Sequence, residues 1–128
     1  MIAFGRQLAE GLVPPATIEL VGDLGAGKTT LTKGIAQALG VNDEVVSPSF
    51  AIMKTYAGRT SRLVHFDFYR LNNDPGLMLE ELADSVADPS TITVVEWADT
   101  ASDTLPINRV KVVINYNDDA TRSVEVSE

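Results

Sequence analysis

Three segments of the chain place apolar residues at the three- and four-residue spacing of a helix face, namely residues 2–12, 28–39 and 77–83. Pro14-Pro15 follows the first segment and would end a helix there. Gly40 stands directly after the second, where a glycine C-cap is common. The pattern therefore predicts three helices, of which the second is the best delimited.

Short apolar runs predict six strands, at residues 17–21, 51–56, 63–68, 92–97, 110–116 and 123–126. Turn residues at 58–60 and at 117–119 predict two hairpins. Strands that alternate with helices are typical of an α/β domain. We expect a mixed sheet flanked by helices, with parallel strands inside and antiparallel strands at the edges. The length of 128 residues, without repeat or linker, predicts a single domain over residues 1–128.

The composition argues against several classes of protein and site. The chain is 45% hydrophobic and 22% charged, which is typical of a globular domain. No apolar run approaches the roughly 20 residues that span a bilayer, and the first residues lack the order of a signal peptide. There is no cysteine for disulfides or thiolate metal sites. These features predict a cytoplasmic protein that does not bind membranes.

The charge balance argues against strong nucleic-acid binding by this chain alone. Ten basic and eighteen acidic residues give a formal net charge of −8. A duplex-binding surface normally carries a cluster of basic residues. Here the lysines and arginines are scattered along the chain.

A phosphate-binding motif occupies residues 22–29, which read GDLGAGKT and fit G-x-x-x-x-G-K-[ST]. The motif follows a predicted strand and opens a predicted helix, as a P-loop requires. Its amides and the positive end of the helix would surround phosphates, Lys28 would reach the β- and γ-phosphates, and Thr29 would bind Mg²⁺. Thr30 either contacts the α-phosphate or is an ordinary first-turn residue. The predicted nucleotide-binding residues are Asp23, Gly25, Ala26, Gly27, Lys28, Thr29 and Thr30.

Two acids directly follow apolar strands, and a P-loop site needs such acids for its metal and its attacking water. Asp67 ends the run LVHF, and Glu96 ends the run ITVV. Ligands of open α/β sheets bind at the carboxyl ends of the strands. We therefore predict Lys28, Asp67 and Glu96 as catalytic residues, and Thr29 with the two acids as metal ligands. The alternative for each acid is a solvated carboxylate at a strand end.

Four further features allow two interpretations each. His65 shares a strand face with Asp67 and either orients it or is a structural histidine. Arg70 either pairs with a carboxylate or phosphate or forms a surface salt bridge. Residues 47–50 form either a switch segment or an ordinary turn. Trp97, the only tryptophan, is expected to pack rather than to stack on a ligand.

Four sequence motifs, taken together, resemble those of one protein family. GDLGAGKTT at 22–30, SPSF at 47–50, HFDFYRL at 65–71 and VEW at 95–97 occur in the order found in the bacterial TsaE (YjeE) ATPases. Those proteins support the formation of threonylcarbamoyladenosine in tRNA. Ser49 stands where the family usually has threonine, and Ala98 where it usually has proline. Family members usually carry a further N-terminal segment with residues near the adenine, and this chain begins almost directly in its first predicted helix.

The resemblance implies a three-layer P-loop NTPase fold that binds ATP and Mg²⁺. Asp67 would stand at the Walker B position, Glu96 near the metal and the attacking water, and residues 47–50 in a switch-like loop. Family proteins act with the TsaB–TsaD pair and are thought to reset or activate that complex with ATP. We expect slow turnover by the chain alone, because no arginine is an obvious finger.

Other functions remain open at this stage. A small-molecule P-loop kinase usually has an arginine-rich lid, and we find none. A guanine-nucleotide switch usually carries N-K-x-D, which does not occur. A nucleotide-dependent binding module that does not hydrolyse ATP fits the same motifs.

Overall fold

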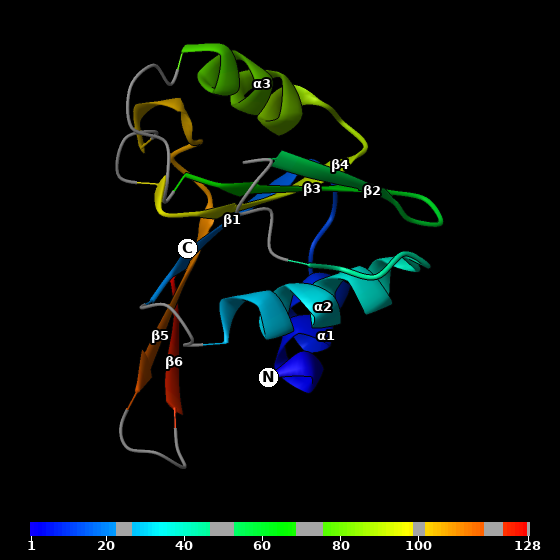
Figure 1. The fold of residues 1–128 in the computed structure, drawn as a ribbon, viewed down its shortest axis with the longest axis vertical. Helices are drawn as coiled ribbons and strands as arrows, with labels where there is room; N and C mark the ends of the chain where they lie inside the picture. The colour runs from blue at the N-terminus through cyan, green and yellow to red at the C-terminus, as the bar shows by residue number, and fades with distance from the viewer. Residues whose placement is uncertain (23–26, 47–52, 69–75, 99–101, 117–121, 128) are drawn as a thin grey trace.

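A computed structural model describes residues 1–22, 27–46, 53–68, 76–98, 102–116 and 122–127. Six strands form one sheet in the order β2-β3-β4-β1-β5-β6 (Figure 1). Their bounds are β1 Ala16–Val21, β2 Met53–Ala57, β3 Arg62–Asp67, β4 Thr91–Glu96, β5 Val110–Tyr116 and β6 Arg122–Ser127. The four inner strands are parallel and the two edge strands antiparallel, so the predicted mixed sheet is confirmed.

The helices lie on both faces of this sheet and make three layers (Figure 1). Helices α1, Ile2–Glu10, and α2, Lys28–Leu39, lie on one face, and α3, Gly76–Ala87, lies on the other. A short 3₁₀ turn, η2, spans Ser102–Thr104. One apolar cluster fills the space under α1 and α2, and a second lies under α3. Within the described residues, none of the helices combines the length and hydropathy that spanning a bilayer requires.

Helices α1 and α2 touch backbone to backbone. A Cβ atom added at Gly5 would lie 2.2 Å from the Leu31 carbonyl oxygen, and one added at Gly34 would lie 2.1 Å from that of Ile2. Both distances are far inside van der Waals contact, so only glycine fits at the crossing. The N-terminal helix is thereby seated directly on the helix that follows the phosphate loop.

Most element bounds agree with the sequence prediction. Helix α2 has the predicted bounds, and Gly40 caps it in the left-handed conformation with φ 77°. The hairpin of β2 and β3 is antiparallel as predicted. Residues 51–52 and the predicted turn at 117–119 lie outside the described residues.

Helix α3 is longer than predicted, since it continues to Ala87 rather than ending at residue 83. Asp84-Ser85 resembles a helix end in the sequence. In the structure the Ser85 hydroxyl makes a buried 2.7 Å hydrogen bond with the Thr93 hydroxyl of β4. The polar residue therefore faces the sheet within the helix instead of stopping it.

Candidate active site

The phosphate loop leaves the central strand of the sheet. Strand β1 ends at Val21, Gly22 follows, and α2 begins at Lys28. Gly27 caps the helix with φ 107°, a left-handed conformation that favours glycine. The amides of the first helical turn point out of the N-terminal end of α2, where an anion would be stabilised. Asp23, Gly25 and Ala26 lie outside the described residues.

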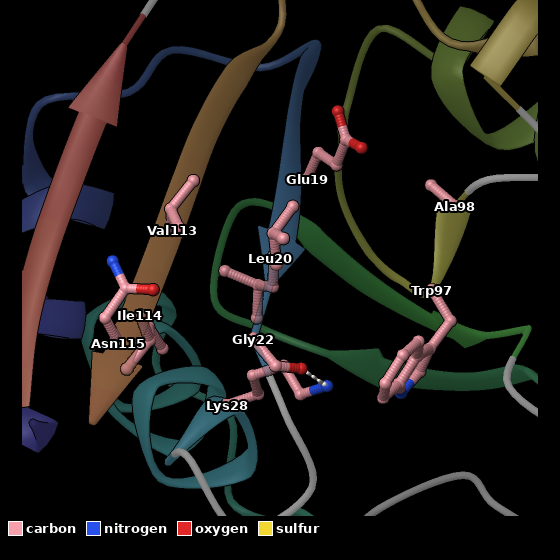
Figure 2. Close-up of a pocket in the computed structure, with 10 residues that line it drawn as sticks. Glu19, Leu20, Gly22, Lys28, Trp97, Ala98, Val113, Ile114 and Asn115 are labelled. Atoms are coloured by element: carbon pink, nitrogen blue, oxygen red, sulfur yellow. Dashed lines mark hydrogen bonds between the residues drawn. The ribbon is translucent and has the colours of Figure 1, made fainter.

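Lys28 is buried at 5% exposure, which is rare for a lysine. Its Nζ donates a 2.6 Å hydrogen bond to the Gly22 carbonyl oxygen (Figure 2). The same atom lies 3.7 Å from Glu96 Oε1. It also lies 4.1 Å from the centre of the Trp97 ring, within cation–π range. The ammonium is thus held between the ends of β1 and β4.

Asp67 and Glu96 end adjacent parallel strands and are direct partners in the register of β3 and β4. Asp67 is 8% exposed and Glu96 is 3% exposed. The alternative that they are solvated carboxylates is therefore wrong for both. The structure brings Glu96 into contact with Lys28, and the strand register brings Asp67 beside Glu96.

His65 is fully buried in β3, and its Nε2 is hydrogen-bonded to Glu96 Oε2. Among the residues that the structure describes, its Nδ1 has no hydrogen-bond partner. One of the two predicted roles of His65 was to orient Asp67, but the observed hydrogen bond goes to Glu96. Only the register between β3 and β4, which the sequence does not contain, reveals this partner.

Trp97 follows Glu96 directly and has φ 55°, the left-handed region that a bulky residue rarely adopts. Strand β4 therefore ends at Glu96, one residue before the predicted end. The turn carries the indole ring over the Lys28 ammonium (Figure 2). Trp97 also packs against the apolar cluster under α3, as predicted, but its contact with Lys28 was not foreseen.

A cavity of about 350 Å³ adjoins Lys28 and lies along the ends of β1, β4 and β5. Its lining residues are Glu19, Leu20, Val21, Gly22, Lys28, Trp97, Ala98, Val113, Ile114 and Asn115 (Figure 2). Glu19 is fixed by Arg109, whose Nε donates a 2.7 Å hydrogen bond to its carboxylate. This places an open volume directly beside the cation of the phosphate loop.

The donor atoms at this edge suit Mg²⁺, which prefers oxygen ligands. Thr29 and Thr30 are half-buried in the first turn of α2, and the two carboxylates are buried at the neighbouring strand ends. Within the described residues, no three His, Cys, Asp or Glu side chains are grouped to hold a metal by themselves. Mg²⁺ usually completes its shell with water and substrate phosphates, so a sparse set of protein ligands fits it. Arg70 and residues 47–50 lie outside the described residues.

Comparison with known proteins identifies the family. A sequence profile of the family described as "Threonylcarbamoyl adenosine biosynthesis protein TsaE" matches residues 1–124. The chain belongs to the TsaE family. The resemblance predicted from the four motifs is thereby confirmed.

Individual TsaE relatives match most of the chain. The tRNA threonylcarbamoyladenosine biosynthesis protein TsaE of Haemophilus influenzae is 36% identical over 98% of this chain and 82% of its own length. The protein of the same name from Bacillus subtilis is 38% identical over 95% of this chain and 75% of its own length. The crystal structure of Bacillus subtilis YdiB superposes with a TM-score of 0.77 at 35% identity, covering 96% of this chain and 74% of that one. The fold is the α/β P-loop NTPase fold that the sequence predicted.

Proposed function

We propose that the chain binds ATP with Mg²⁺ and hydrolyses it in the service of threonylcarbamoyladenosine formation in tRNA. The observation that carries the proposal is the buried contact between Lys28 and Glu96, 3.7 Å apart where β1 and β4 end and α2 begins. A buried pair of opposite charges beside an anion-binding helix end is what triphosphate chemistry needs. The names of the TsaE relatives support the pathway.

Lys28 has the central role in binding. In the structure its ammonium is satisfied by the Gly22 carbonyl oxygen and faces Glu96. A triphosphate in the loop offers stronger, charged acceptors for the same N–H groups. We propose that Lys28 exchanges its contact with Gly22 for the β- and γ-phosphate oxygens. Charge that develops on the γ-phosphate would then be met by this ammonium and by the amides at the start of α2.

Glu96 and Asp67 would serve the water and the metal. Mg²⁺, when bound, would neutralise charge on the phosphates, held by Thr29 and Asp67 with Glu96 close by. The Glu96 carboxylate is buried and fixed on two sides, so it can hold an attacking water in line without reorganising.

We further propose that the chain acts with TsaB and TsaD in the cytoplasm, and that these partners accelerate its turnover. Among the described residues, no arginine lines the cavity beside Lys28. P-loop NTPases that lack such an arginine in cis hydrolyse slowly until one is supplied. The isolated chain should therefore turn over slowly.

The first test compares Lys28→Ala with Lys33→Ala, a matched substitution further along α2. Calorimetry with Mg–ATP should show binding by the unsubstituted chain and by Lys33→Ala. Lys28→Ala should lose about 10- to 150-fold in affinity, because a charged hydrogen bond to phosphate contributes about 1.5–3 kcal/mol. Folded, unsubstituted protein that gives no heat with ATP or GTP would overturn the proposal.

The second test is Glu96→Gln, which keeps the shape of the side chain and removes its charge. ATP affinity should change little, while phosphate release with TsaB–TsaD present should fall by about 10²–10⁴-fold. Normal turnover by this variant would remove Glu96 from the mechanism. Transfer of phosphate to a small acceptor by the unsubstituted chain would instead indicate a kinase, and binding without any turnover would indicate a non-hydrolysing module.

A further inference from the structure

His65 is the only histidine of the chain and is completely buried inside the sheet. It lies on β3 opposite Val94 of β4, and it reaches past that residue to Glu96. The hydrogen bond joins His65 Nε2 to Glu96 Oε2. Glu96 Oε1, the other oxygen, faces Lys28 Nζ at 3.7 Å. The two oxygens of one carboxylate therefore have two different partners.

This division determines how the carboxylate is oriented. A glutamate has three side-chain dihedral angles, and its terminal one is broad, so a strand-end glutamate is not oriented by its backbone alone. A hydrogen bond from a rigid, buried ring to Oε2 fixes the plane of the carboxylate. Oε1 is then directed toward Lys28, the first residue of α2. The ring cannot shift easily, because β3 is paired on both sides, to β2 and β4.

We propose that His65 is a positioning residue that holds the Glu96 carboxylate in the orientation needed for attack on the γ-phosphate. The inference rests on the proposed function for the role of Glu96 in hydrolysis. Its geometric part, the bond from Nε2 to Glu96, is testable without any nucleotide.

A purely structural histidine is the competing interpretation. Buried polar side-chain atoms usually have at least one hydrogen-bond partner, and a histidine kept only for the stability of the sheet could find it on any neighbouring element. Within the described part of the chain, only Nε2 is bonded, and it is bonded to Glu96. The two nitrogens can be separated by substitution, because the amide nitrogen of glutamine reaches the position of Nε2 and that of asparagine reaches only the position of Nδ1.

The kinetic test compares His65→Gln with His65→Asn, using ATP turnover in the presence of TsaB–TsaD. The asparagine variant should lose about 10–100-fold in kcat, as substitutions behind a functional ligand do, with KM for ATP nearly unchanged. The glutamine variant should recover most of that loss. Equal kcat values for the two variants, or a loss that appears in KM alone, would overturn the inference.

Thr93→Val is the matched control for the loss of a buried polar contact. Thr93 is on the same strand as Glu96, is fully buried, and bonds Ser85 on the side of α3. This variant should lower the melting temperature and leave kcat unchanged. If both variants lower the melting temperature and both lower kcat by the same factor, the role of His65 is structural only.

An NMR measurement on the nucleotide-free protein tests the geometry independently. The ring nitrogens of a single histidine are unambiguous in a proton–nitrogen correlation spectrum. Nε2 should carry a proton, because a carboxylate oxygen accepts, and its resonance should move in Glu96→Gln but not in Thr93→Val. An Nε2 chemical shift that is the same in Glu96→Gln as in the unsubstituted protein would contradict the inference. Absence of ATP turnover by the unsubstituted chain with its partners, together with the expected NMR shift, would instead refute the proposed function while leaving the contact itself established.

Discussion

Three ionisable side chains, Lys28, His65 and Glu96, meet at one end of the sheet, and each is no more than 5% exposed. Such burial is costly unless charges are paired, and removing one partner of a buried pair typically costs about 3–5 kcal/mol. Apolar side chains buried to the same extent would hold these strand ends together without the free-energy cost of burying charge. The arrangement therefore indicates that the residues are placed for chemistry more than for stability.

Asp88 shows a different use of charge at the residue scale. It accepts hydrogen bonds from the Ser90 amide at 2.9 Å and the Ser90 hydroxyl at 3.0 Å, and it pairs with Arg62. The two hydrogen bonds from Ser90 are the main cause that lowers the pKa of Asp88. Thr91 and Arg62 lower it further by smaller amounts. A carboxyl whose pKa is lowered by folding stabilises the fold above its unfolded pKa, and the stabilisation disappears as the pH falls through the folded pKa.

We accordingly predict that the stability difference between the unsubstituted chain and Asp88→Asn is constant above about pH 5 and shrinks below about pH 4. The asparagine keeps an acceptor for Ser90 but has no proton to bind. Urea unfolding at a series of pH values measures the difference. A difference that grows as the pH falls would mean that the sign of the pKa shift is wrong. The effect should be small, because the carboxylate is exposed to solvent.

At the scale of elements, α1 and α2 make the closest backbone contact. Among the described glycines, an added Cβ would come nearest to other atoms at Gly5 and Gly34, where these helices cross. Gly5 and Gly34 allow the two backbones to meet, and the phosphate loop ends at the N-terminal end of α2. The position of Lys28 therefore depends on how α2 is seated between α1 and the sheet.

We predict that Gly34→Ala destabilises the chain by about 3 kcal/mol, the upper part of the range for overpacked cores, because its Cβ would overlap the Ile2 carbonyl. Gly11→Ala is the control. Its Cβ would lie 3.7 Å from the Leu8 carbonyl oxygen, and its φ of −88° suits alanine. That change should alter stability by less than about 1 kcal/mol. Thermal or urea unfolding of both variants measures the difference. Equal stabilities of Gly34→Ala and Gly11→Ala would show that α1 can move aside.

The elements were largely predictable because their ends carry strong local signals. Gly27 and Gly40 delimit α2, and short apolar runs mark the strands. The acids at 67 and 96 were predictable as neighbours because parallel strands end at one edge. The contacts of His65 and Trp97 were not, since one depends on strand register and the other on a left-handed backbone turn. The end of α3 was misjudged because Ser85 finds its partner in β4, far away in sequence.

At the scale of the whole molecule, the formal net charge of −8 sets the kind of partner that suits the chain. Binding to nucleic acid without sequence preference depends on lysines and arginines that neutralise phosphates. An acidic surface repels the same phosphates at long range. The net charge therefore disfavours strong, non-specific binding of tRNA by this chain alone.

We predict that the isolated chain shows no saturable binding to tRNA up to about 10 μM at physiological salt, which lies within the usual range for non-specific binding. Fluorescence anisotropy of labelled tRNA measures this. The same titration with TsaB–TsaD added serves as the positive control. Tight, salt-sensitive binding by the chain alone would contradict the prediction.

The central place of β1 has a consequence for how the chain is made. This strand, residues 16–21, is synthesised before both of its neighbours, which are distant in sequence: β4 at residues 91–96 and β5 from residue 110. During translation it stays without β4 until residues 91–96 have emerged from the ribosome, and without β5 until still later. Such non-local pairing is characteristic of slow folding. In a nascent chain, β1 and the segment that follows it therefore gain their supporting strands only after residues far along the chain have been made.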